Sequence, residues 1–372
     1  MKIVNGAYAS ADIFTDAVED YAVAQIQQLC DNVAMDGCKI RIMPDVHPGK
    51  VGTIGFTSTI GDKILPNVIG VDIGCGITLA RIKQKKVEYQ KLDKIIRENI
   101  PVGYANRKKP HRFSEEFDFS RLHCMRAINE TKAKVSIGTL GGGNHFIELD
   151  KDEEGNIYVA IHSGSRHLGK EVTEYYLNEG QKYLKAQGIG VQYELTYLKD
   201  DLKESYLHDL QVVQKFAELN RAAMLDELVK GMKFKIEEEY SVIHNYVDFS
   251  GEEPILRKGA ISAKAGEVVV IPINMADGIL LGAGLGNAEW NYSAPHGSGR
   301  KMNRESVKNN YTVSQFKNEM KGVYSSCVDK ETLDEAPFAY RRIENILPDI
   351  QETVSVSKIL KPIYNYKAGG ND

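Results

Sequence analysis

Residues 39–82 read KIRIMPDVHPGKVGTIGFTSTIGDKILPNVIGVDIGCGITLARI, and their pattern decides the fold class. Three short apolar runs, KIRIMPDV, GTIGFTSTI and GITLARI, are separated by Gly, Pro and Asp. Runs of this length bounded by turn-forming residues predict β-strands joined by loops. Because helical patterns lie on both sides of this block, we expect an α/β or α+β protein with a mixed sheet.

The segments outside this block alternate between helical and strand-like spacing. Residues 9–33 repeat apolar side chains at intervals of three and four, which predicts one long helix capped by Ser10 or Asp12. Residues 169–240 are rich in Leu, Glu, Lys and Ala and predict several helices, inserted in a single domain of residues 1–372. Further helices are expected at 89–99, at 120–134 and after 315, and further strands at 136–149, at 157–161 and after 258.

Composition indicates a globular protein with a large core. The chain has 372 residues, 42% of them hydrophobic, and only 11 prolines, and we find no linker of low complexity. The N-terminal residues lack the pattern of a secretion signal, and no segment reaches the roughly 18 to 20 apolar residues of a membrane span. We therefore expect a cytoplasmic protein without a membrane partner. Five cysteines, an odd number without framework spacing, predict reduced thiols.

The overall charge argues against a nucleic-acid partner, but two local patches favour one. The formal net charge is −4, from 47 basic and 51 acidic residues. Basic residues cluster in NRKKPHR at 106–112 and in GRKMNR at 299–304. The alternative interpretation of each patch is a solvated surface turn.

Histidine is the most informative residue type. The chain has nine histidines, and five of them lie beside Gly, Asn, Asp or Pro: His47, His145, His162, His244 and His296. A single histidine is more often a hydrogen-bonded core or surface residue than a ligand, so the local context of each decides its interpretation.

The segment VDIGCG places Asp72 and Cys75 three residues apart after an apolar run. Both side chains could face one ion, and a carboxylate, a thiolate and imidazoles together suit Zn, Mn, Fe or Co. The alternative is a small buried cysteine in a tight turn.

Two further segments join glycine to polar side chains. GTLGGGNHFIEL carries Asn144, His145 and Glu148 after a glycine run that would let a phosphate or a base approach the backbone. IHSGSRHLG offers His162 and Arg166, a combination suited to a metal ligand beside a phosphate donor. A simple tight turn is the alternative for the glycine run.

Two histidines remain. The stretch EEEYSVIHNYV resembles the end of a helix with His244 projecting from it. SAPHGSGRKMNR places His296 in a glycine-flanked turn before basic residues, where an imidazole could act as ligand, general base or nucleophile. No GxxxxGK[ST] motif is present, so nucleotide binding would need another architecture.

These motifs together resemble one family. MPDVHPGK, NVIGVDIGCG, LGGGNHFIE, HSGSR, HN, HGSGR and KPxxxxK follow one another in the order of RtcB-type RNA ligases, from Arg41 to Lys367. The resemblance implies an RtcB-like mixed-sheet fold and a site with two manganese ions. It assigns the metal ligands to Asp72, Cys75, His145, His162 and His244, with Cys75 as the bridge.

The resemblance also implies how GTP is used. His296 matches the residue that becomes linked to GMP. Asn144, Glu148, Arg166, Tyr340 and Lys367 match residues around the guanine nucleotide, and Asn274 stands where the family leads us to expect a serine-bearing loop that touches it. Ser298 and Asn303 are two further departures from the family pattern.

The implied activity is a sequence of phosphoryl transfers on RNA. A 2′,3′-cyclic phosphate is opened to a 3′-phosphate, GMP passes from GTP to His296 and then to the RNA, and a 5′-hydroxyl attacks. The expected RNA partner is spliced or broken tRNA, or ribosomal RNA. The alternatives are a metal-dependent phosphoesterase that opens cyclic phosphates, and an idle RNA- or ribosome-binding protein.

Overall fold

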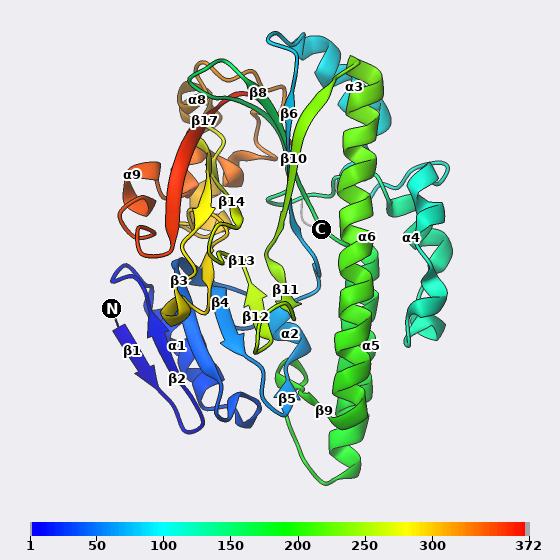
Figure 1. Ribbon diagram of the computed structural model, residues 1–372, viewed down its shortest axis with the longest axis vertical. Helices are drawn as coiled ribbons and strands as arrows, with labels where there is room; N and C mark the ends of the chain where they lie inside the picture. The colour runs from blue at the N-terminus through cyan, green and yellow to red at the C-terminus, as the bar shows by residue number, and fades with distance from the viewer. Residues whose placement is uncertain (1, 369–372) are drawn as a thin grey trace.

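The three apolar runs of residues 39–82 form strands in the computed structural model, which describes residues 2–368. They are β3 (Lys39–Pro48), β4 (Thr53–Thr59) and β6 (Gly76–Ile82). Helices flank the sheets that these strands enter, so the predicted combination of helices with a mixed sheet is confirmed (Figure 1). Met1 and residues 369–372, which the expected domain of 1–372 includes, lie outside the described residues.

The first sheet has six strands in the order β1-β2-β3-β4-β12-β11. β2 pairs with β3 in parallel, and the other neighbours are antiparallel, which makes this sheet mixed. Its remaining strands are β1 (Lys2–Asn5), β2 (Ser10–Ile13), β11 (Asn245–Asp248) and β12 (Ile255–Lys258).

The second sheet has seven antiparallel strands in the order β10-β6-β8-β7-β17-β15-β14. β17 (Val354–Lys367), the last strand in the sequence, lies between β7 and β15. The remaining strands are β7 (Phe146–Lys151), β8 (Ile157–Ser163), β10 (Ile236–Ile243), β14 (Val268–Asn274) and β15 (Gly278–Gly284).

One connection between the two large sheets is a single residue long. β10 ends at Ile243 in the seven-stranded sheet and β11 begins at Asn245 in the six-stranded sheet, so only His244 separates these two strands. The backbone N–H of His244 donates to the carbonyl of Cys75, and that of Gly74 donates to Asn245. The junction is therefore anchored to the turn that precedes β6.

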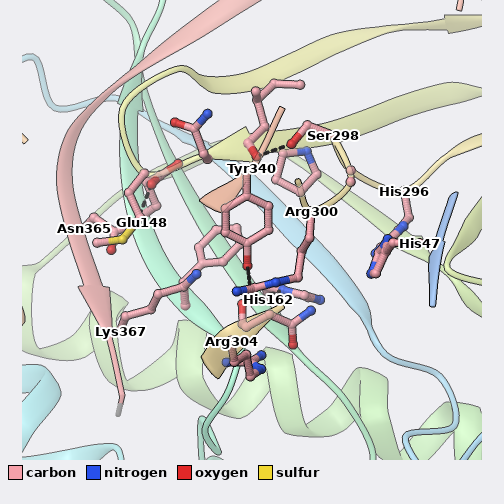
Figure 2. Close-up of a pocket in the computed structure, with 18 residues that line it drawn as sticks. His47, Glu148, His162, His296, Ser298, Arg300, Arg304, Tyr340, Asn365 and Lys367 are labelled. Atoms are coloured by element: carbon pink, nitrogen blue, oxygen red, sulfur yellow. Dashed lines mark hydrogen bonds between the residues drawn. The ribbon is translucent and has the colours of Figure 1, made fainter. Parts of the chain in front are cut away.

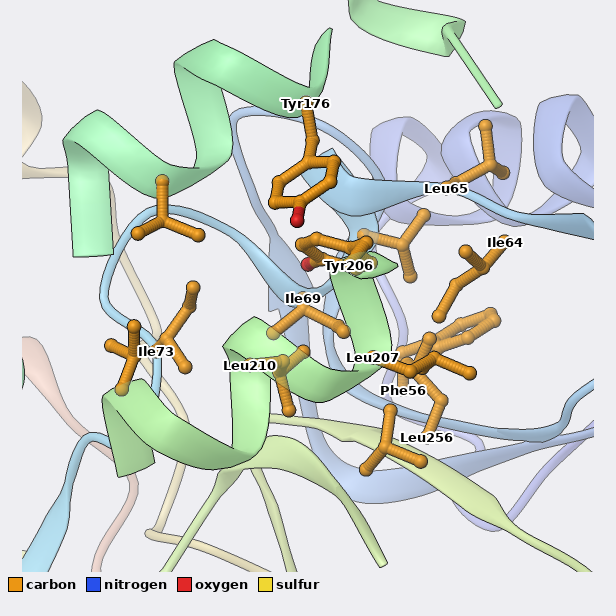
Figure 3. Close-up of a cluster of buried hydrophobic side chains, with 14 of the residues drawn as sticks. Phe56, Ile64, Leu65, Ile69, Ile73, Tyr176, Tyr206, Leu207, Leu210 and Leu256 are labelled. Atoms are coloured by element: carbon orange, nitrogen blue, oxygen red, sulfur yellow. The ribbon is translucent and has the colours of Figure 1, made fainter. Parts of the chain in front are cut away.

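Two long helices cover the sheets on one side. α5 (Arg166–Ala186) and α6 (Asp200–Met232) pack against each other, and α6 runs along the length of the molecule (Figure 1). Tyr176 of α5 and Leu210 of α6 pack with Ile69 and Phe56 in the largest buried cluster (Figure 3). Burying side chains of this size contributes roughly 1.5–3 kcal/mol each.

Shorter elements complete the fold. α3 (Tyr89–Asn99) matches its predicted bounds and packs on α6. The others are α1 (Asp20–Cys30), α2 (Pro66–Ile69), α4 (Glu130–Ser136), α7 (Arg304–Asn310), α8 (Val313–Glu319), α9 (Ile343–Ile346), β5 (Lys63–Ile64), β9 (Leu198–Lys199), β13 (Ala260–Ser262) and β16 (Ser293–Pro295). Among residues 2–368, no helix is both long enough and apolar enough to cross a membrane.

One predicted helix is confirmed only in its second half, and another is wrong. Residues 9–33 form β2 and then α1, because β2 gains hydrogen bonds from β1 and β3 on both sides, and the N-cap is Glu19. Residues 236–243 form β10 and not the end of a helix. β10 is an edge strand, whose exposed glutamates resemble the polar face of a helix in sequence.

Three predicted boundaries also need correction. Within 120–134, only the start of α4 is α-helical, because Asn129 caps this helix and 3-10 turns precede it. The strand predicted at 136–149 begins only at Phe146, since glycines with positive φ keep the preceding loop out of the sheet. The predicted short strands near the C-terminus are one strand, β17.

Candidate active site

The five residues expected to bind metal meet at one end of the seven-stranded sheet. Cys75 directly precedes β6, His145 directly precedes β7, His162 is the penultimate residue of β8, and His244 directly follows β10. These four strands are neighbours in the order β10-β6-β8-β7 and alternate in direction. The starts of β6 and β7 and the ends of β8 and β10 therefore lie at the same end of the sheet. Asp72 lies at the same end of the sheet, in the turn before Cys75.

The ligand atoms form two overlapping groups. Cys75, His162 and His244 make one group, and Asp72, Cys75 and His145 make the other, with ligand atoms within 4.8 Å of one another in each. The Sγ atom of Cys75 belongs to both groups. It lies 3.4 Å from Nε2 of His145 and 3.3 Å from Nε2 of His162. The shared thiol is the arrangement that a bridge between two ions requires.

Backbone carbonyls orient two of the imidazole rings. Nδ1 of His145 lies 2.9 Å from the carbonyl of Leu140, and Nδ1 of His162 lies 3.2 Å from that of Asn144. A neutral ring that donates Nδ1–H to a carbonyl keeps a lone pair on Nε2. These lone pairs converge on the Cys75 sulfur, so the donor set fits a cation.

Burial and neighbouring charges set the pKa values of the cluster. Burial would raise the pKa of Asp72, but hydrogen bonding to His145 and the charge of Arg166 lower it below its usual range. Burial and the adjacent Asp72 raise the pKa of the Cys75 thiol well above its usual value. Without a cation the thiol is therefore protonated, and metal binding would release this proton.

Two residues of α6 hold the ligand loops from behind. The Asn220 side chain accepts from the N–H groups of Gly138 and Thr139 at 2.8 and 3.0 Å and donates to Gly164 at 3.0 Å. The Arg221 guanidinium is fully buried and donates to the carbonyls of Gly74 and Ser163, at 2.9 and 3.0 Å. α6 thus fixes the loops around His145, His162 and Cys75.

Position 164 must be glycine because the Asp72 carboxylate, one of the expected metal ligands, lies against it. A Cβ atom on Gly164 would lie 2.1 Å from Oδ1 of Asp72. The same Oδ1 accepts from the backbone N–H of Ser165 at 3.0 Å. Any side chain at position 164 would therefore displace the Asp72 carboxylate.

The five expected metal ligands, Asp72, Cys75, His145, His162 and His244, form what we call the metal-type cluster. His296 lies next to this cluster and is oriented by a buried carboxylate. Its Nδ1 atom is 2.7 Å from Oδ2 of Asp45, which is fully buried, and its ring centroid is 4.7 Å from that of His244. A neutral ring that donates Nδ1–H to Asp45 keeps the lone pair of Nε2. Asp45 and His296 are 251 residues apart in the sequence, and Asp45 was not predicted to belong to the site.

His47 is a second residue without a predicted role. It lines the same cavity as His296, and its Nδ1 atom lies 2.9 Å from the backbone carbonyl of Asp45 (Figure 2). Burial lowers the pKa of His47 to about 4, although this hydrogen bond opposes the change. The ring is therefore neutral at physiological pH.

The cavity beside His296 collects most of the expected nucleotide residues. Five of the six expected residues line it: Asn144, Glu148, Asn274, Tyr340 and Lys367. Arg166, the sixth, lies on a neighbouring cavity and donates to the carbonyl of Gly103 at 3.1 Å. The structure brings these side chains together, and their roles stay predictions.

Glu335 organises the basic side of the cavity. This buried carboxylate accepts from Lys367 Nζ at 2.7 Å, from the Tyr340 hydroxyl at 2.5 Å and from Arg300 at 3.1 Å, and it pairs with Arg304 at 2.6 Å. Burial would raise the pKa of Glu335, but Lys367 and the two arginines lower it to about 2. Figure 2 shows Lys367, Tyr340 and Arg300 converging on the cavity.

Two further expected residues differ in how their side chains are used. Glu148 faces the cavity and accepts from Nδ2 of Asn365 at 2.5 Å (Figure 2). Oδ1 of Asn274 accepts from the N–H groups of Ala276 and Asp277, both at 2.9 Å. Asn274 therefore lines the cavity while its side chain stabilises its own turn.

A second cavity opens on the other side of the cluster. It shares Asn144 and Arg304 with the first cavity, and Arg166 also lines it. Of the described residues that line it, Lys132, Arg166, Lys170 and Arg304 are basic and only Asp72 is acidic. Tyr104, 79% exposed, stands at its edge. Charge of this sign with an exposed aromatic ring suits an anionic ligand that carries a ring.

Short motifs already contained several residues that sequence reasoning missed. Asp45 and His47 lie in MPDVHPGK, Arg300 in HGSGR, and Glu335 in the segment EAPFAY that also holds Tyr340. Nothing in the local sequence shows that Asp45 contacts His296 or that Glu335 contacts Lys367, because the chain folds over large distances to make these pairs.

The fold and the site together define a class: α/β proteins with a Cys, His and Asp cluster fit for divalent ions, next to cavities suited to anionic ligands. A family model described as tRNA-splicing ligase RtcB matches residues 28–368. The chain therefore belongs to the RtcB family.

Individual relatives agree with this assignment. The chain is 31% identical over 365 residues to the RNA-splicing ligase RtcB of Escherichia coli K12, covering 87% of this chain and 88% of the relative. It is 26% identical to the tRNA-splicing ligase RtcB of Aeropyrum pernix, covering 86% of this chain and 85% of the relative. The expected family membership is confirmed.

Proposed function

We propose that this protein is a GTP- and manganese-dependent RNA ligase. It joins an RNA end with a 2′,3′-cyclic phosphate or 3′-phosphate to an end with a 5′-hydroxyl, in tRNA splicing or RNA repair. The observation that carries the proposal is the pair of His296 and Asp45, 2.7 Å apart, beside the Cys75 cluster. The ligase names of the bacterial and archaeal relatives support it.

His296 is the proposed nucleophile. Its Nδ1–H points to Asp45, so the Nε2 lone pair can attack the α-phosphorus of GTP. An N–P bond forms, and the P–O bond to the leaving pyrophosphate breaks. The Asp45 carboxylate stabilises the positive charge that develops on the ring, as a buried carboxylate does for other catalytic histidines.

The cavity supports a guanine nucleotide in this position. Arg300, Arg304 and Lys367 surround Glu335 and supply positive charge for phosphates, and Glu148 offers acceptor oxygens for the N–H groups of a base. Arginine and lysine contacts of this kind bind phosphate without a GxxxxGK[ST] loop.

Asp72, Cys75, His145, His162 and His244 would hold two manganese ions, with Cys75 shared between them. Bound ions of this kind polarise phosphate oxygens and offset their charge. The chain's own residues orient the reacting groups: Asp45 orients His296, and α6 holds the ligand loops.

The RNA ends are proposed to enter through the second cavity. Water first opens a cyclic phosphate to a 3′-phosphate. This phosphate then attacks the GMP on His296, which breaks the N–P bond and leaves the RNA activated, and the 5′-hydroxyl displaces GMP to form the new phosphodiester. Lys132, Arg166 and Lys170 line the approach and suit a phosphate backbone.

The decisive experiment is labelling with α-labelled GTP and manganese, followed by a denaturing gel and acid treatment. We expect an acid-labile label on the wild-type protein, none on His296→Ala, and a normal label on His123→Ala, an exposed histidine whose ring stacks on His208. A label that survives in His296→Ala would contradict the proposed nucleophile. No label on the wild type would favour the phosphoesterase or the idle RNA-binding protein.

A further inference from the structure

Two carboxyl groups lie side by side in the interior next to the cavity. Glu148 and Asp150 are two residues apart on β7 and therefore face the same side of the sheet. Glu148 is 3% exposed and lines the cavity, and Asp150 is fully buried behind it. Asn365 is the register partner of Glu148 on β17.

Among the described residues, no protein N–H or O–H group donates to the buried carboxyl oxygens of Asp150. Its cross-strand neighbours are Tyr158, whose hydroxyl donates to Asp152 at 3.2 Å, and Pro362, which has no N–H. An ionised carboxylate without donors is strongly destabilised in such a place, so Asp150 carries a proton.

The acceptor for the Asp150 proton is the Glu148 carboxylate, two residues away on the same side of β7. This contact raises the pKa of Asp150 and lowers that of Glu148. Burial and the charge of Glu148 raise the pKa of Asp150 well above its usual value. Burial also raises the pKa of Glu148, to about 7, while Asn365, Asp150 and Lys367 oppose that rise. Two adjacent buried carboxyl groups that share one proton are the expected state of such a pair.

We propose that Asp150 is a positioning residue for base recognition: its protonated carboxyl donates to Glu148 and so holds Glu148 as a carboxylate that accepts two hydrogen bonds from the ligand. The edge of guanine fits this acceptor, because N1–H and the 2-amino group are adjacent donors. Adenine presents an acceptor at N1 and would face the carboxylate unfavourably. This inference rests on the proposed function, in which the cavity binds GTP.

The other titratable groups near Glu148 and Asp150 come from β17, from β8 and from the lining of the cavity. From β17, Lys367 faces Phe146 and pairs with Glu335 at 2.7 Å. From β8, Tyr158 is the register partner of Asp150, and His162 is that of Phe146 and lines the cavity. The other titratable groups that line the cavity are His47, His296, Arg300, Arg304 and Tyr340.

The direction of the pH effect follows from the Glu148 carboxylate. GTP binding is retained above the pKa of Glu148 and is lost as the pH falls through about 7, because protonation removes an acceptor oxygen. An apolar residue at position 150 removes the donor, so the pKa of Glu148 rises and the loss begins at higher pH. Asparagine keeps an N–H donor and leaves the profile in place.

The test measures equilibrium binding in the His296→Ala background, which prevents covalent attachment. GTP, ITP and ATP are titrated at saturating manganese between about pH 6 and 9 into the full chain with Asp150, Asp150→Asn or Asp150→Val. All variants share the same metal cluster and ligand ionisation, so differences between them report position 150. ITP lacks the 2-amino group and isolates that contact.

We expect Asp150→Asn to bind GTP within about twofold of the parent, and Asp150→Val to bind roughly tenfold more weakly near neutral pH, which corresponds to one lost hydrogen bond to a charged group. Its affinity recovers at higher pH, and its preference for GTP over ITP shrinks near neutral pH. An unchanged profile in Asp150→Val overturns the proposal. If that variant does not fold, weakened binding with a shifted profile in Asp150→Asn overturns it, and a parent that binds no GTP contradicts the proposed function instead.

Discussion

The contact between Asp45 and His296 decides which ring nitrogen of His296 faces the cavity. We expect Asp45→Asn to slow GMP attachment by more than about 100-fold, because the amide removes the charge that stabilises the ring and can reverse its tautomer. Single-turnover labelling with α-labelled GTP measures the rate. A rate within a few-fold of wild type in a folded Asp45→Asn protein would show that His296 reacts without this partner.

Tyr104 tests the second cavity at the same scale. We expect Tyr104→Ala to weaken binding of an RNA with a 3′-phosphate about tenfold, because stacking on an exposed ring stabilises a base by roughly 1–3 kcal/mol, and to leave GMP attachment unchanged. Tyr21→Ala is the matched control, since this residue is 65% exposed on α1. Equal RNA affinity of the two variants would exclude the second cavity as the path of the RNA.

Sequence patterns indicated residue types better than residue partners. The turn VDIGCG and the resemblance pointed to Asp72 and Cys75, and the structure brings both into the ligand groups. Asp45 and Glu335 could not be predicted, because their partners His296 and Lys367 are distant in the sequence. Only the folded sheets bring these pairs within hydrogen-bond distance.

At the scale of elements, α6 supports the ligand loops that the strands present. We expect Asn220→Ala to lower the free energy of unfolding by about 3 kcal/mol, since it leaves the buried N–H groups of Gly138 and Thr139 without their acceptor. Urea denaturation measures the change. Lys215→Ala, on the exposed face of the same helix, is the control and should stay within about 0.5 kcal/mol of wild type. A similarly small effect of Asn220→Ala would mean that the ligand loops are stable without the hydrogen bonds from Asn220.

The elements that were predicted correctly have local causes. α3 matches its predicted bounds because its apolar residues repeat at helical spacing. β2 and β10 were missed because their hydrogen-bond partners, β1, β3 and β6, stabilise them from elsewhere in the chain. Short segments of this kind carry too little local preference to overcome such pairing.

For the whole molecule, the metal-type cluster links binding to stability. Ligand atoms at the ends of β6, β7 and β8, in the turn at Asp72 and at the junction residue His244 would share the bound ions. Manganese at 100 times its dissociation constant should raise the free energy of unfolding by about 2.7 kcal/mol, because the unfolded chain lacks the assembled site. Denaturation with and without manganese, after treatment with a chelator, measures this. Equal stabilisation of Cys75→Ala would place the ions elsewhere.

The overall class could be predicted from the sequence, but the arrangement of the sheets could not. Alternating strand and helix patterns gave α/β with a mixed sheet, and the ordered motifs gave the family. The strand order depends on pairings such as that of β17 with both β7 and β15, which no local pattern encodes.

The position of β17 inside the seven-stranded sheet also affects how the protein folds during translation. The ribosome synthesises β17 after both of its neighbours, β7 and β15. Until β17 is added, the backbone N–H and C=O groups on one edge of each neighbour have no strand to pair with. Asn365 and Lys367 reach the cavity only when this strand inserts. A nascent or prematurely stopped polypeptide that lacks β17 would therefore lack part of the wall of the cavity beside His296, and truncated copies could not form the proposed nucleotide site.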